Sequence, residues 1–122
     1  ARWVVDLARS HRRRLMVRLV KGAYWDSEIK FAQVGGYEDY PVFTRKVATD
    51  VSYLACARVL LGAGDCIYPA FATHNATTIG AILAMAKGPF EFQRLHGMGE
   101  PLYEGLARLE RELGRPETPV RI

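Results

Sequence analysis

The sequence has few cysteines and no long apolar run, and both absences exclude classes of protein. Its two cysteines, Cys56 and Cys66, stand ten positions apart without a histidine cluster, which fits neither a zinc site nor a disulfide framework. No apolar stretch approaches the ~20 residues that a membrane-spanning helix needs. We therefore expect no metal site and two buried, free thiols in a reducing compartment.

Motifs for several common kinds of catalysis are also missing. No predicted strand is followed by GxGxxG, no carboxylate pair stands at a strand end, and no Ser/His/Asp set or metal-ligand cluster is present. The usual dinucleotide fingerprint and hydrolysis by these routes are therefore unsupported. The content of 49% apolar and 25% charged residues is that of one ordinary folded domain.

Positive charge is concentrated near the amino terminus. Residues 1–21 hold seven Lys and Arg against one Asp, a net charge of +6, whereas the whole chain carries +4. The cluster Arg12, Arg13 and Arg14 follows a predicted helix at 3–10, and a helix C-terminus favours cations. No aromatic residues interleave with it, as a base-stacking platform would require. We therefore favour a helix end, with a basic nucleic-acid-binding segment as the alternative.

The chain alternates between amphipathic stretches and short apolar runs. Helices are expected at 3–10, 26–31, 44–61, 76–87 and 101–113, and strands at 15–20, 66–73, 90–95 and 119–122. We expect the strand at 15–20 to be buried on both faces. The predicted core-facing stripes of two helices are Val47, Val51, Leu54 and Ala55, and Leu102, Leu106, Leu109 and Leu113.

This alternation, without hairpin signals, predicts an α/β fold with parallel strands and right-handed crossovers. Periodicity does not decide between an open doubly wound sheet and a barrel, but both place a ligand at the carboxyl ends of the strands. Polar residues stand at three of these ends. They are Arg18 with Lys21, then Thr73, His74 and Asn75, then His96 after Leu95.

These residue types suggest what the ligand is. An arginine inside a strand needs partners that offset its desolvation. Arg18 and Lys21, with Tyr24 and Trp25 next to them, are expected to face a planar, anionic cofactor. The helix start at Thr44, Arg45 and Lys46 offers hydroxyl, cationic and backbone donors that suit a phosphate. An ordinary helix start is the alternative, although cations there oppose the helix dipole.

Four segments together resemble one family. RLVKGAYWDSEIKFAQ, YPVFTRKVATDVSYLACA, YPAFATHNATTI and FEFQRLHGMGEPLYE, within about residues 15–107, are similar to the proline dehydrogenase domain of bacterial bifunctional proline utilization flavoenzymes. The resemblance implies a distorted (βα)8 TIM-type barrel with FAD at its C-terminal mouth. It also implies oxidation of L-proline to Δ1-pyrroline-5-carboxylate, the first step of proline catabolism to glutamate, by hydride transfer to the flavin.

The resemblance also implies partners and a location. Electrons pass to a membrane quinone, an aldehyde dehydrogenase domain is a possible part of the same parent chain, and the parent is cytoplasmic and peripherally membrane-associated. Arg18 corresponds to the arginine beside flavin N5 and is the expected catalytic residue. The expected FAD-binding residues are Arg18, Val20, Gly22, Trp25, Thr44, Arg45, Lys46, Thr73 and His74, and the expected proline-binding residues are Tyr24 and Leu95.

The match covers part of the family domain. Residues 1–122 resemble about the fourth to the seventh strand of the barrel, without the paired arginines that bind the proline carboxylate, and 111–122 match less closely. We expect these residues to be one partial barrel domain that is inactive alone. On composition, a non-flavin barrel enzyme for an anionic substrate, such as a phosphosugar, remains an alternative.

Overall fold

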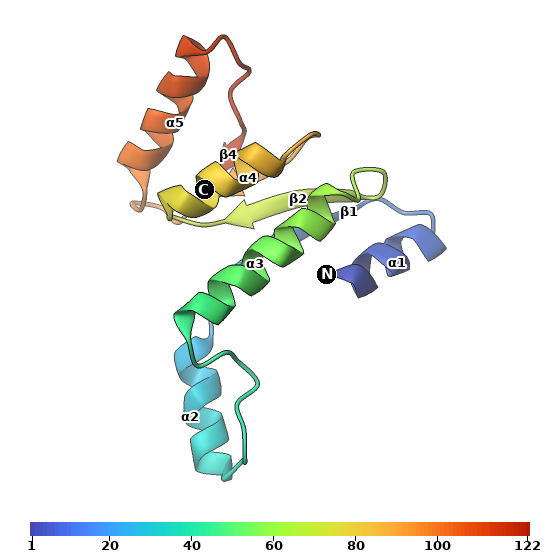
Figure 1. Cartoon of the computed structure of the whole chain (residues 1–122), viewed down its shortest axis with the longest axis vertical. Helices are drawn as coiled ribbons and strands as arrows, with labels where there is room; N and C mark the ends of the chain where they lie inside the picture. Colours follow the sequence, from blue (N-terminus) through green and yellow to red (C-terminus); the bar gives the residue numbers. More distant parts are fainter.

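A four-stranded parallel sheet forms the centre of the computed structural model, which describes all of residues 1–122. The strands lie in the order β1-β2-β3-β4, and helices connect them (Figure 1). The strands are β1 (Leu15–Leu19), β2 (Ile67–Ala72), β3 (Glu91–Gln93) and β4 (Val120–Arg121). The helices are α1 (Arg2–Ser10), α2 (Trp25–Gly35), α3 (Lys46–Leu61), α4 (Ala76–Met85) and α5 (Glu100–Glu112).

The parallel α/β prediction is confirmed, and local signals explain the start of α4 and the end of α2. The Asn75 side chain caps α4 by accepting a 2.9 Å hydrogen bond from the Thr78 backbone N–H. Gly36, with φ +63°, ends α2 in the left-handed conformation that glycine adopts readily. No helix is both long enough and apolar enough to span a membrane.

One face of the sheet packs against helices through two clusters. The larger joins α3, α4 and α5 to the middle strands, and Phe71, Phe90, Phe92 and Tyr103 form its aromatic centre. Phe90 and Phe92 meet edge to face with ring centroids 5.3 Å apart, a favourable aromatic geometry. The smaller cluster joins α1 and the end of α3 to the amino ends of β1 and β2.

Three predictions about burial are wrong. In α3, Val47 and Val51 are exposed, because the face that meets the sheet carries Tyr53, Ala57 and Leu60 instead. In α5, Leu109 and Leu113 are exposed, whereas Tyr103, Leu106 and Glu110 are buried. Strand β1 is half-buried rather than covered on both sides, since Met16 and Arg18 lie on a face that no helix cluster covers.

Helix α2 projects away from the sheet and forms an arm with the segment that returns to α3 (Figure 1). It is eleven residues long, more than the one or two turns expected at 26–31. The Trp25 indole N–H ties the base of this arm together by donating a 2.9 Å hydrogen bond to the Phe43 carbonyl. The arm therefore has a fixed base next to the carboxyl end of β1.

Tyr103 anchors α5 to the end of β2. Its hydroxyl donates a 2.6 Å hydrogen bond to the Thr73 carbonyl, and burial raises the pKa of Tyr103 to about 12, partly opposed by Arg94. Because an unfolded tyrosine has a pKa of about 10, this group stabilises the fold fully below pH 10. That contribution is lost as the pH rises through 12.

Replacing Tyr103 with Phe is therefore expected to destabilise α5 by about 1–2 kcal/mol, because the Thr73 carbonyl loses its hydrogen-bond donor. Hydrogen exchange of α5 peptides in the full-length protein measures this difference at neutral pH. Since the variant lacks the titrating hydroxyl, its deficit should shrink above about pH 10. A deficit that is constant up to pH 12 would contradict this assignment.

Candidate functional site

The face of the sheet opposite the helices carries the polar side chains of the candidate site. We call it the open face, and its residues belong to neither core cluster. Because residues paired in a parallel ladder point to the same side, the register defines this face. It comprises Met16, Arg18, Tyr68, Ala70, Ala72, Glu91, Gln93 and Arg121.

Arg18 is held on the open face by one side-chain hydrogen bond. Its Nε–H donates to Gln93 Oε1 at 2.7 Å, and the residue is exposed. Neither terminal nitrogen of the guanidinium bonds to a protein atom. Arg18 therefore keeps four of its five N–H donors and its full positive charge available to a ligand.

A groove of about 840 Å³ lies beside the carboxyl end of β1, between the arm and α3. Its volume is in the range of small-molecule and cofactor sites. Five predicted site residues line it, namely Val20, Gly22, Tyr24, Trp25 and Thr44. Gly22 has φ +77° and open space where a Cβ would project, so the backbone is accessible there.

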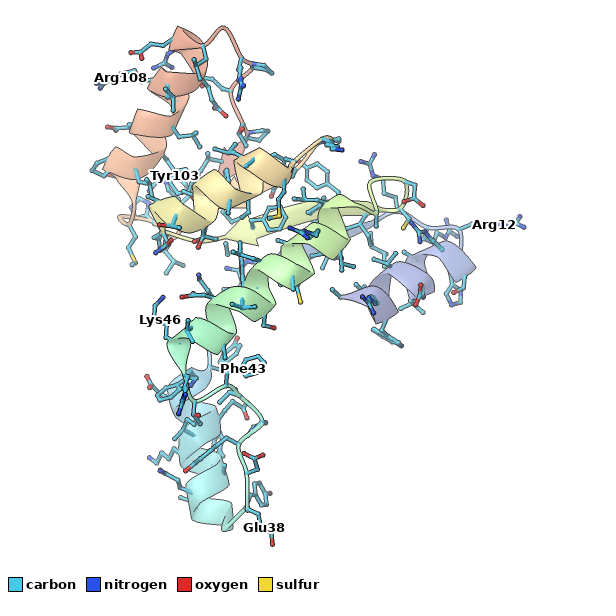
Figure 2. All side chains as sticks on the ribbon, viewed as in Figure 1. Arg12, Glu38, Phe43, Lys46, Tyr103 and Arg108 are labelled. Atoms are coloured by element: carbon cyan, nitrogen blue, oxygen red, sulfur yellow. The ribbon has the colours of Figure 1, made fainter.

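Lys46 lies in a smaller adjoining groove at the start of α3, near Phe43 (Figure 2). It donates a 2.6 Å hydrogen bond to Asp50, and Lys21 donates one of 2.7 Å to the other oxygen of the same carboxylate. Lys21 also donates to Thr78 and lies 5.1 Å from the centre of the Tyr53 ring. Lys21 lines both grooves, where Asp50 and Thr78 hold its ammonium group, so the expectation that it faces a ligand stays a prediction.

Asp50 is the shared acceptor of this cluster. The hydrogen bonds from Lys21 and then Lys46 lower the pKa of Asp50 below its ordinary value. A lowered carboxyl pKa stabilises the fold above the unfolded value of about 3.9, and this stabilisation is lost as the pH falls through the folded value. The ion pairs of this cluster are therefore intact at neutral pH and are lost in acid, when Asp50 is protonated.

Replacing Asp50 with Asn is expected to lower the thermal midpoint of the full-length protein at pH 7, because Lys21 and Lys46 then face a neutral amide. The difference from wild type should disappear as the wild-type carboxylate is protonated below about pH 3.9. Differential scanning fluorimetry across this range measures it. Glu38→Gln, a charge loss on the exposed arm, is the control, and equal effects of the two substitutions would contradict the assignment.

His74 links the ends of β2 and β3. Its Nε2 accepts a 3.2 Å hydrogen bond from the Leu95 backbone N–H, so a neutral ring carries its proton on Nδ1. Gly99 packs against the ring closely enough that a Cβ would lie 3.0 Å from His74 Cδ2. Thr73 is buried, and its hydroxyl oxygen accepts from the Asn75 N–H without donating to the protein.

The structure therefore distributes the predicted residues over the open face, the strand ends and the two adjoining grooves. Arg18 lies on the open face, His74 and Leu95 at strand ends, five residues in the groove, and Lys46 in the adjoining one. Arg45 precedes α3 and lines neither groove. Sequence reasoning missed Gln93, Glu91 and Asp50, although the alternation in FEFQ puts Glu91 and Gln93 on one face.

Parallel strands with helices packed on one face of the sheet fit an α/β fold of the TIM-barrel type rather than a doubly wound sheet, which is covered on both faces. A family model described as proline dehydrogenase matches residues 1–122, and the chain belongs to that family. It is 59% identical to the Bifunctional protein PutA of Escherichia coli K12 and 57% identical to that of Rhizobium meliloti. Each alignment covers 98% of this chain.

Solved structures show the same relationship. The chain matches a Bradyrhizobium japonicum Proline Utilization A (PutA) mutant with a TM-score of 0.86 at 56% identity. It matches PutA from Bdellovibrio bacteriovorus, inactivated by N-propargylglycine, with a TM-score of 0.83 at 35% identity. Both matches cover 98% of this chain and 12% of the solved chain. The chain spans 9–10% of the length of the curated relatives named above.

Proposed function

We propose that this chain contributes the flavin side of a proline dehydrogenase site, which oxidises L-proline to Δ1-pyrroline-5-carboxylate. The observation that carries the proposal is Arg18 on the open face, with its terminal nitrogens free, in a chain that matches the family over its whole length. On the inner face of a barrel fold such a guanidinium requires an anionic partner, because burial without one is costly.

The residues present fit FAD. A planar, anionic cofactor is matched by the cation of Arg18, the accessible backbone at Gly22 and the half-exposed ring of Trp25. Thr73 supplies an uncommitted hydroxyl proton at the end of β2. The proposed FAD-binding residues are Arg18, Val20, Gly22, Trp25, Thr44, Arg45, Lys46, Thr73 and His74. When bound, FAD would supply the electron acceptor for proline oxidation.

The protein residues orient the reactants and control charge. Arg18, the proposed catalytic residue, presents a fixed positive charge where negative charge accumulates as electrons arrive, which stabilises that state. Tyr24 and Leu95 expose apolar surface that is proposed to bind the proline ring and to exclude water from it. No side chain is required as a nucleophile.

We also propose how these residues fit into the barrel and the parent chain, and where the electrons go. Residues 1–122 would form about the fourth to the seventh strand of one FAD-binding barrel and be inactive by themselves, because an open sheet leaves edges unpaired. The relatives are named bifunctional, which supports an aldehyde dehydrogenase domain in the same parent chain. A membrane quinone is the proposed electron acceptor, reached by peripheral membrane association of a cytoplasmic parent.

Flavin absorbance of the purified full-length protein tests this function. We expect a yellow protein whose flavin absorbance is bleached by L-proline without oxygen, and an isolated 1–122 segment without that activity. D-Proline serves as the control for substrate recognition. A colourless protein that does not take up FAD would reject the proposal, and a yellow protein that proline does not reduce would reject the substrate.

A further inference from the structure

The hydrogen bond from Arg18 to Gln93 crosses an entire strand. Arg18 is in register with Ala70 on β2 and, through Ala70, with Glu91 on β3. Gln93 lies one row nearer the carboxyl ends, in register with Ala72. The backbones of Arg18 and Gln93 are thus two strand spacings, about 9.6 Å, apart across the sheet and about 6.6 Å apart along the strands, and the two side chains bridge this separation.

Two small residues make this crossing possible. Ala70 and Ala72 are the β2 residues under the path, and their methyl groups leave room above the strand for the Arg18 and Gln93 side chains. Ala70 is fully buried although it lies on the open face, as expected for a residue covered by its neighbours' long side chains. The guanidinium is consequently drawn toward the carboxyl ends of the strands.

The orientation of the Gln93 amide is fixed from both sides. Its Nε2 donates a 2.9 Å hydrogen bond to Glu91 Oε1, and Glu91 Oε2 accepts one of 2.7 Å from Arg121. Burial raises the pKa of Glu91, but the hydrogen bonds from Arg121 and Gln93 and the positive charge of Arg121 outweigh burial and lower it, so Glu91 is ionised. An ionised carboxylate only accepts and a guanidinium only donates, so the amide has one satisfactory orientation.

We propose that Gln93 is a positioning residue, which Glu91 locks in place and which holds the Arg18 guanidinium toward the carboxyl ends of the strands. This inference rests on the proposed role of Arg18 toward FAD. An amide suits the task because it fixes the cation without neutralising it. A carboxylate at position 93 would cancel the charge of Arg18 and face the carboxylate of Glu91.

A double-mutant cycle in the full-length holoenzyme tests the proposal. Gln93→Leu removes the acceptor at similar volume and is expected to slow flavin reduction by proline about 10- to 100-fold, because Arg18 loses its position. In an Arg18→Met background the same substitution should slow it less than twofold further. In the Gln93→Leu single variant, the flavin midpoint potential should fall toward the value of Arg18→Met. Adding Gln93→Leu to Arg18→Met should leave the potential unchanged.

Two further measurements keep the possible failures separate. Gln33→Leu, the same substitution on exposed α2, should leave rate and potential unchanged. Equal losses from Gln93→Leu in both Arg18 backgrounds would overturn the proposal by showing that Gln93 acts independently. A crystal structure of the Gln93→Leu variant requires no flavin, and an unmoved Arg18 side chain there would also overturn it. A colourless wild-type protein would reject the proposed function. The crystal structure of the Gln93→Leu variant would still decide whether Gln93 positions Arg18.

Discussion

Replacing Arg18 with Met in the full-length protein is expected to slow flavin reduction by proline about 10²–10³-fold while FAD content changes little. Methionine keeps most of the aliphatic length but removes the charge and the Nε–H donor to Gln93. The other proposed FAD-binding residues, in the groove and at the strand ends, remain in place. The loss should therefore fall on the rate rather than on cofactor retention.

Stopped-flow reduction by proline and flavin content per protein chain, measured on the same preparation, distinguish the two effects. Arg14→Met is the matched control, because Arg14 lies just before the opposite end of β1, near the Tyr68 ring. We expect it to alter neither quantity. Parallel losses of rate and FAD content in Arg18→Met would show that Arg18 serves only as a cofactor anchor.

The order of elements could be predicted from the sequence because each element has a local signal. The branched apolar run at 15–20 and the Asn75 cap act over a few residues, and the structure follows them. Burial was harder to predict, because α3 carries apolar residues on two faces. The face with Tyr53 and Ala57 meets the sheet, and only tertiary packing reveals this.

The site was predictable in part for the same reason. Arg18 was identified because a charged residue in an apolar strand is conspicuous in the sequence alone. Its partner Gln93 is 75 positions away, and a glutamine near a strand end carries no signal of its own. Lys21 was identified in the same way, but its partner Asp50 lies 29 positions away in α3 and was not. Contacts between side chains so far apart in the sequence depend on the order and register of the strands, which local sequence patterns do not determine.

Replacing Phe92 with Ala is expected to destabilise the sheet by about 3–5 kcal/mol, the range for a large buried aromatic. Phe92 is fully buried at the centre of the larger cluster. Its ring meets Phe90 edge to face and lies 5.9 Å from the ring of Tyr103. Truncation therefore leaves a cavity that the surrounding strand and helices cannot close without moving.

Hydrogen exchange of β2 and β3 peptides in the full-length protein measures this loss, with Phe31→Ala on exposed α2 as the control. If the two substitutions accelerate exchange equally, the aromatic cluster does not hold the sheet together. Phe92→Leu should recover much of the stability because it refills most of the cavity.

The same substitution tests whether the core supports the site. Phe92 stands between Glu91 and Gln93 in β3, and its side chain points to the helices while theirs point to the open face. A strand that shifts into the cavity carries both residues with it, so Phe92→Ala should also slow flavin reduction in protein that remains folded. In an Arg18→Met background this additional slowing should largely vanish, because the guanidinium that the shifted strand would misplace is already absent.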